Sequence, residues 1–273
     1  MSLMLILLPP SETKAPGGTG APVDLGALSF PTLTPVRAEI LADLSALNVD
    51  DALEVLGISG ALRAEAEANL ILADAPTMPA LERYTGVLYD ALDAATLTAQ
   101  DADARSRLAV GSALFGVVRA DDLIPHYRLS AGTKLPLRAG GPTPTLKKRW
   151  GTLITTALQE TPDGSGDGVI VDLRSGGYQG LGKVAAWDAA SGTGAVTVRV
   201  ESVRPDGTRK VVSHFNKHYK GLLARELATA GAAADAARTA DDVASLIADA
   251  GLTVEINGPV GGKPPKDTLT LVV

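Results

Sequence analysis

Four separate stretches of this 273-residue chain gather side chains that could hold an anion or move a proton. They span residues 11–14, 122–128, 172–178 and 214–220. A lysine or arginine in each stretch could offset the charge of a phosphate group, and the nearby carboxylates and histidine could act as a general acid or base. The candidate phosphate-binding residues are Lys14, Arg128, Arg174, Ser175, Asn216, Lys217 and Lys220. The candidate acid–base residues are Glu12, Asp172 and His214. Asp122 and Asp172 could instead only orient the arginines beside them.

Tyrosines near these stretches offer flat rings on which nucleic-acid bases could stack. The four candidates are Tyr84, Tyr89, Tyr127 and Tyr178. Only 4% of the residues are aromatic, so packing in a hydrophobic core is the competing interpretation.

The sequence gives little support for a bound metal or cofactor. His214 and His218 have the i, i+4 spacing of two metal ligands on a helix, but the pattern around His214 predicts the end of a strand. The chain has no cysteine, and it lacks the Walker A loop, the GxSxG elbow, the HExxH zinc motif and the GxGxxG dinucleotide pattern. We therefore expect no metal site and no cofactor.

Short apolar runs place the chemistry-bearing stretches at strand ends. Residues 3–8 and 169–171 are continuous apolar runs, typical of strands buried on both faces. Residues 195–203 alternate apolar and polar side chains, and a Pro-Asp-Gly turn leads to a returning strand at 208–215, which predicts a β-hairpin. Open α/β sheets bind ligands at the carboxyl ends of their strands, so the four stretches could converge on one cleft. We interpret residues 111–136, which mix apolar and charged side chains, as a wall of that cleft.

The order of the elements predicts a single α/β domain over residues 1–273, with a mixed β-sheet flanked by helices. Further strands are expected at 252–256 and 268–272. Apolar stripes and capping signals predict helices at 34–47, 99–109, 146–158 and 222–230.

Residues 50–72 have the pattern of two short helices joined by a hairpin that contains glycine. Gly57 and Gly60 could let the backbone amides of the turn approach a phosphate, as in a helix-hairpin-helix element. An ordinary antiparallel helix pair explains the same pattern, and three glutamates surround the turn.

Charge is unevenly distributed along the chain. The net charge is -6, yet residues 112–225 carry 16 basic and 9 acidic side chains, whereas residues 1–111 carry 6 and 15. Because local potential steers an anionic ligand, the basic middle section allows a phosphate-bearing partner. The apolar start is too short to span a membrane and lacks the basic start of a signal peptide. Together with the absence of cysteine, this predicts a cytoplasmic protein with no membrane contact.

Five motifs, in order along the chain, resemble the YaaA-type peroxide stress resistance family. They are LLPPSETK, ERYTGVLYDAL, SALFGVVRADDLIPHYRL, VDLRSGGY and VSHFNKHYKG. The resemblance implies protection from hydrogen peroxide by limiting free intracellular iron. It also implies one domain with a basic cleft and a DNA-binding helix-hairpin-helix element, here residues 53–70. By the same resemblance, the cleft residues would be Lys14, Arg128, Lys217 and Lys220.

Two functions follow as expectations. The first is a peroxide stress protein that binds duplex or distorted DNA in the basic cleft and helps limit damage from free iron. The second is an enzyme that acts on a nucleotide or a small phosphate-bearing substrate in the same cleft, which a deep pocket in place of an open groove would favour. A direct iron sink is the weakest hypothesis, because a chain with no cysteine and three histidines would need clustered carboxylates to hold iron.

Overall fold

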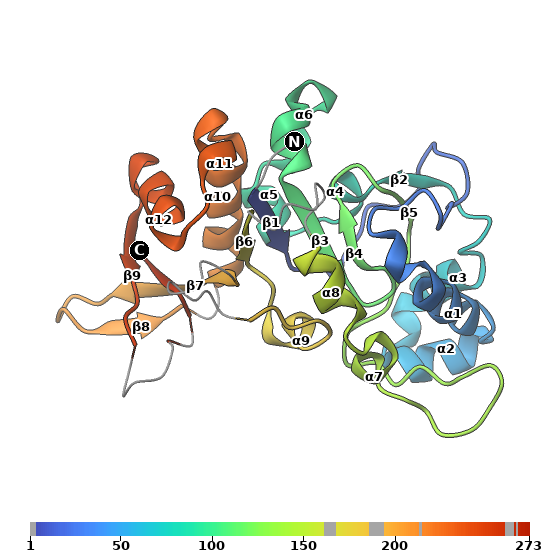
Figure 1. Ribbon diagram of the computed structural model, residues 1–273. Helices are drawn as coiled ribbons and strands as arrows, with labels where there is room; N and C mark the ends of the chain where they lie inside the picture. The colour runs from blue at the N-terminus through green and yellow to red at the C-terminus, as the bar shows by residue number, and fades with distance from the viewer. Residues whose placement is uncertain (1–3, 161–167, 186–193, 213–214, 260–264, 266) are drawn as a thin grey trace.

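A computed structural model describes residues 4–160, 168–185, 194–212, 215–259, 265 and 267–273. Within these residues the main feature is an eight-stranded sheet, in which seven strands follow the order β4-β3-β1-β6-β7-β10-β9 and β8 pairs with β7 (Figure 1). The strands are β1 (Met4–Leu8), β3 (Leu108–Ser112), β4 (Gly116–Arg119), β6 (Val169–Asp172), β7 (Ala195–Val203), β8 (Arg209–Val211), β9 (Thr253–Ile256) and β10 (Leu269–Val272). A separate two-stranded ribbon joins β2 (Thr77–Pro79) to β5 (Leu123–Pro125).

The centre of the sheet is parallel. Strand β1 pairs in parallel with β3 and β6, and β7 pairs in parallel with β6 and β10. All five residues of β1 are buried, which explains why its sequence is a continuous apolar run. In the β1–β6 register Leu7 lies opposite Asp172, so the segments that follow these two strands leave the sheet side by side.

Helices pack on this sheet and also form a group beside it (Figure 1). The α-helices are α1 (Thr34–Ser45), α2 (Val49–Leu56), α3 (Arg63–Leu70), α4 (Ala80–Arg83), α5 (Val87–Ala91), α6 (Ala102–Ser106), α7 (Leu146–Trp150), α8 (Leu153–Gln159), α9 (Gly176–Gln179), α10 (Asn216–Thr229), α11 (Ala232–Ala236) and α12 (Ala240–Asp249). Short 3-10 helices lie at Pro31–Leu33, Gly60–Leu62, Ala94–Thr96 and Ala99–Asp101.

Helix α10 carries three of the predicted site residues, Asn216, Lys217 and Lys220. It packs against α5 and contacts β1. Gly221 permits the close approach to α5, because a Cβ at this position would lie 2.3 Å from the carbonyl oxygen of Leu88. The first turn of α10 is thereby held near the segment that precedes α5.

Helices α1, α2 and α3 lie together at one end of the molecule, beside the β2–β5 ribbon (Figure 1). Buried Arg37 of α1 ties this group to β4, because its guanidinium donates to the carbonyl oxygens of Phe115 and Val117 at 2.9 and 2.7 Å. The side chain of Asn69 in α3 exchanges two hydrogen bonds with the backbone of Arg128, at 2.8 and 2.9 Å. These bonds fix α3 to the segment that follows β5.

The predicted fold class is confirmed, since the chain forms a mixed sheet flanked by helices. The strands expected near 3–8, 169–171, 252–256 and 268–272 are present as β1, β6, β9 and β10. The predicted helix at 99–109 is wrong: α6 ends at Ser106, and Leu108 begins a strand whose residues are all buried in the sheet.

Three other expectations about the elements need correction. The helix predicted at 146–158 is interrupted at Gly151, whose φ of 53° ends α7 before α8 begins. The strand predicted at 208–215 is shorter, because β8 ends at Val211. Helix α10 begins at Asn216, so Lys217 and Lys220 lie on the first turns of a helix and not directly after a strand. The segment 111–136 is not simply a cleft wall, because its first part, including Phe115, is fully buried in the core.

Candidate functional site

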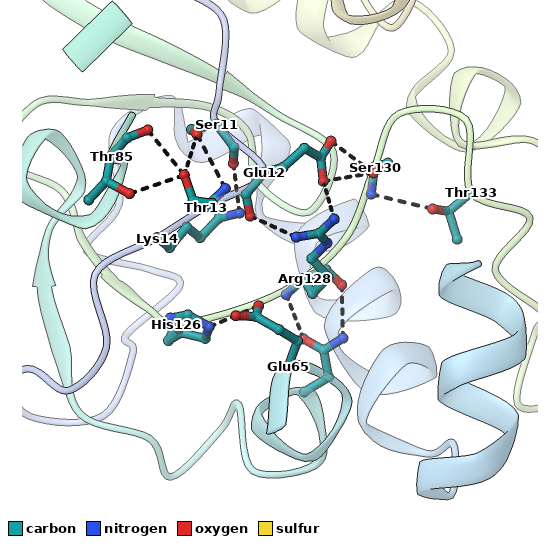
Figure 2. Close-up of polar contacts among 11 residues, drawn as sticks. Ser11, Glu12, Thr13, Lys14, Glu65, Thr85, His126, Arg128, Ser130 and Thr133 are labelled. Atoms are coloured by element: carbon teal, nitrogen blue, oxygen red, sulfur yellow. Dashed lines mark hydrogen bonds and ion pairs between the residues drawn. The ribbon is translucent and has the colours of Figure 1, made fainter. Parts of the chain in front are cut away.

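The segment that leaves β1 meets the segment that follows β5, and their polar side chains form one hydrogen-bonded cluster (Figure 2). Arg128 donates from Nη1 to the carbonyl oxygen of Glu12 at 3.1 Å, and its Nη2 lies 3.2 Å from Glu12 Oε2. The Ser130 hydroxyl donates to the same carboxylate, 3.0 and 3.1 Å from its two oxygens. The structure therefore brings Glu12 and Arg128 together as an ion pair, in which the charge of each is largely compensated.

Lys14 lies beside this pair and is only 8% exposed. Its Nζ donates to the carbonyl oxygen of Ser11 at 3.0 Å and lies 4.4 and 5.4 Å from the ring centroids of Tyr127 and Tyr84. Among the described residues, no carboxylate lies within ion-pair distance of this amine. Burial lowers the pKa of Lys14 to about 8, because the ammonium form loses its hydration.

Three of the predicted base-stacking tyrosines belong to the core. Tyr84, Tyr89 and Tyr127 are 2%, 4% and 1% exposed, so too little of each ring is accessible for a base to stack on it. This corrects the expectation of an aromatic cleft at these positions. The hydroxyl oxygens of Tyr84 and Tyr127 are 2.7 Å apart, and that of Tyr127 is 2.7 Å from Ser112 Oγ. Tyr178 is partly exposed, and burial of its hydroxyl raises its pKa.

Asp172, the last residue of β6, and Arg174, just beyond it, form a buried, two-pronged ion pair. Arg174 donates to the two carboxylate oxygens of Asp172, both at 2.9 Å, and also to the carbonyl oxygen of Gly182 at 2.8 Å. Both side chains are nearly inaccessible, at 1% and 4% exposure. This corrects the expectation that Arg174 meets a phosphate and that Asp172 moves a proton, because each is already occupied by the other. Ser175, which comes next and precedes α9, is exposed.

The first turns of α10 carry the remaining cations. Lys217 is exposed, whereas the Nζ of Lys220 donates to the carbonyl oxygen of Leu173 at 3.2 Å, and burial lowers the pKa of this amine. The Oδ1 atom of Asn216 is buried, and none of the described residues gives it a hydrogen bond. His214 lies outside the described residues.

A cavity of about 260 Å³ lies between the end of β1, the start of α5 and Lys217. Its lining residues are Pro9, Pro10, Ser11, Glu12, Thr13, Thr85, Gly86, Val87, Leu88, Tyr89 and Lys217. Of the predicted site residues, the cavity therefore unites Glu12, Tyr89 and Lys217.

The hairpin between α2 and α3 is joined to the site through α3. Glu65 Oε2 lies 3.1 Å from His126 Nε2 (Figure 2). On the other side of the ring, His126 Nδ1 lies 3.2 Å from the carbonyl oxygen of Ala15. Gly57 has a φ of 64° and ends α2, and a Cβ built on it or on Gly60 would meet no atom within 4 Å. The two glycines thus lie in an open turn.

Sequence reasoning missed the hydroxyl side chains of the site. Ser11 and Thr13 stand two residues apart around a bend at Glu12, where the Ser11 hydroxyl accepts from the backbone amide of Thr13, and serine at such a position is a known turn signal. Their partner Thr85 is 72 residues from Thr13, a proximity that only the fold reveals.

Comparison with known proteins places the chain in a family. Residues 4–249 match the family described as peroxide stress protein YaaA. The chain belongs to the YaaA peroxide stress protein family. A UPF0246 protein of Corynebacterium efficiens is 64% identical over 99% of this chain and 100% of its own length. A UPF0246 protein of Streptomyces coelicolor is 43% identical over 96% of both chains, and one of Shewanella amazonensis is 30% identical over 83% of this chain and 86% of its own.

The span that matches the YaaA family contains the whole of the site described above, from Pro9 to Lys220. Within the described part of this family member, no group of three or more histidine, aspartate or glutamate residues could hold a metal ion. In the same part of the chain, no helix has both the length and the apolar character needed to cross a membrane.

Proposed function

We propose that this YaaA-family protein acts in peroxide stress resistance by binding the phosphate backbone of DNA at the first turn of α10. The observation that carries the proposal is the position of Lys217, which is exposed near the start of a 14-residue helix and borders the cavity at the carboxyl end of β1. The start of a long helix favours anions, because its first amides lack helical partners and its dipole is positive there. The excess of basic residues between 112 and 225 supports the same partner.

The other predicted cations would contribute less to a phosphate contact. Arg174 is buried against Asp172, and Arg128 is paired with Glu12. The open turn at Gly57 offers a second contact, because exposed backbone there can approach a phosphate. We therefore expect the protein to meet few phosphates and to bind without preference for base sequence.

Binding of this kind would also limit damage from free iron. DNA holds an atmosphere of cations along its phosphates, and a protein that neutralises some phosphates releases those cations. Fe(II) in that atmosphere would be displaced from the bound section of DNA. The reaction of hydrogen peroxide with Fe(II) produces radicals that attack sugar and base atoms. After displacement of Fe(II), this reaction would take place further from those atoms.

The alternative of an enzyme has less support among the described residues. The carboxylates of Glu12 and Asp172 are each held by an arginine, so neither is free to take a proton. We therefore favour binding over catalysis.

The proposal is tested by plasmid nicking in Fe(II) and hydrogen peroxide. We expect the native protein to slow nicking and Lys217→Ala to lose most of that protection. The control is Lys147→Ala, which removes one exposed positive charge from α7, away from α10 in Figure 1, and should protect as the native protein does. Equal protection by the two variants, or none by the native protein, would overturn the proposal.

A further inference from the structure

The cavity beside Lys217 has one polar wall and one apolar wall. We propose that it binds a phosphate monoester group, carried either by a small molecule or by the phosphorylated end of a DNA strand. The inference rests on the proposed function in that both use Lys217 for phosphate, but it assigns a separate, concave site to a terminal phosphate. With a volume of about 260 Å³, the cavity is below the usual range for drug-sized ligands and far too small for a duplex.

The polar wall consists of three hydroxyl groups and the lysine. Segment 13–15 pairs with segment 83–85, with an antiparallel bridge between Lys14 and Tyr84, and this pairing brings Thr85 next to Thr13. Thr85 Oγ1 donates to Thr13 Oγ1 at 3.2 Å, and Thr13 Oγ1 lies 3.1 Å from Ser11 Oγ (Figure 2).

The protons of these hydroxyls can be assigned so that one faces the cavity. Thr13 Oγ1 accepts from Thr85 Oγ1 and can in turn donate to Ser11 Oγ at 3.1 Å, and Ser11 Oγ also accepts from the backbone amide of Thr13 at 3.2 Å. The proton of Ser11 is then free for a ligand. A hydroxyl donor and a lysine on one wall are the groups that a phosphate oxygen accepts from.

The carboxylate of Glu12 also borders the cavity, and its charge would oppose an anion. That charge is compensated, because Arg128 and Ser130 hold both carboxylate oxygens. Lys14 lies behind the same segment, 3.0 Å from the carbonyl oxygen of Ser11, and adds positive charge when its amine is protonated. The net field at the polar wall is therefore favourable to a phosphate.

The apolar wall suits the body of a small ester. It is formed by Pro9, Pro10, Val87, Leu88 and Tyr89. The hydroxyl of Tyr89 is not available to a ligand because it donates to the carbonyl oxygen of Pro9 at 3.0 Å. Gly86 also lines the cavity, and its φ is 96°. The lack of a side chain leaves space beside the hydroxyl groups, since a Cβ there would lie 3.3 Å from Thr13 Oγ1 and 3.5 Å from Ser11 Oγ.

The test is calorimetric titration of the full chain with matched pairs of probes: AMP against adenosine, ribose 5-phosphate against ribose, and a short duplex with 5′-phosphates against the same duplex with 5′-hydroxyls. We expect tighter binding of at least one phosphorylated member, weakened about tenfold or more by Ser11→Ala and by Lys217→Ala. Ser106→Ala, an exposed hydroxyl on α6, is the matched control and should bind as the native protein does. A preference limited to the small esters identifies a small molecule as the source, and a preference limited to the duplex identifies a DNA end.

Two results would overturn the inference. One is equal binding of the phosphorylated and unphosphorylated members of all three pairs, and the other is native affinity in both site variants. If the members of every pair bind equally while the duplex loses affinity in Lys217→Ala, the proposed function stands and the inference fails. Circular dichroism of each variant checks that it is folded.

Discussion

Replacement of Lys14 by methionine should stabilise the protein at neutral pH. The lysine amine is buried, and among the described residues its Nζ contacts one hydrogen-bond acceptor, the carbonyl oxygen of Ser11, besides the faces of two tyrosine rings. Methionine has a similar length and volume and needs no hydration, so it can fill the same space without placing a charge in the core.

The size of the effect follows from the pKa of Lys14, which burial lowers from 10.5 to about 8. One pKa unit corresponds to about 1.4 kcal/mol, so the charged lysine lowers the free energy of unfolding by roughly 3 kcal/mol at pH 7. Between pH 8 and pH 10.5 the unfolded chain keeps a proton that the folded chain has lost, so the stability of the native protein rises with pH in this window. Above pH 10.5 Lys14 is uncharged in both the folded and the unfolded chain, so its buried charge no longer lowers stability.

Urea denaturation of the native protein and Lys14→Met at pH 7 and at pH 10.5 measures this difference. We expect the variant to be more stable by up to about 3 kcal/mol at pH 7 and by much less at pH 10.5. Lys147→Met, at an exposed position on α7, should change stability little at either pH. The reasoning is refuted if Lys14→Met is less stable than the native protein at pH 7, or if its advantage is the same at both pH values.

Two further substitutions test the packing that positions the site. Asp172→Asn leaves the buried guanidinium of Arg174 without its charged partner. Urea titrations should therefore show a free energy of unfolding that is lower by about 3–5 kcal/mol. A loss below about 1 kcal/mol would contradict a buried ion pair. Gly221→Ala would place a Cβ 2.3 Å from the carbonyl oxygen of Leu88, so α10 must shift away from α5. Thermal unfolding should show a destabilisation of about 1–3 kcal/mol. An unchanged melting temperature would refute the close approach of the two helices.

Much of the sheet could be predicted from the sequence, because β1 and β6 are short apolar runs buried on both faces. The same rule gave the wrong element at Leu108, since an apolar run beside helix-favouring alanines fits a helix as well as a buried strand. The break between α7 and α8 depends on the positive φ of Gly151, which composition alone does not specify.

The location of the site could be predicted from the sequence, but the ion pairs among its residues could not. Charged residues do follow β1 and β6, as expected for the carboxyl edge of a parallel sheet. The sequence does not show that Arg174 turns back onto Asp172, or that Arg128 reaches Glu12 across 116 residues. Such pairings are set by the fold, and they decide which cations remain open to a ligand.

The most direct test of phosphate binding at the start of α10 is the salt dependence of DNA affinity, measured by fluorescence anisotropy of a labelled duplex. We predict that the native protein binds at low salt, and that the slope of log affinity against log salt becomes less negative by about 0.9 in Lys217→Ala, as expected for one lost phosphate contact. Lys147→Ala should keep the native slope. Phosphate binding at the start of α10 would be contradicted if the native protein did not bind DNA at low salt, or if the native protein and Lys217→Ala had the same slope.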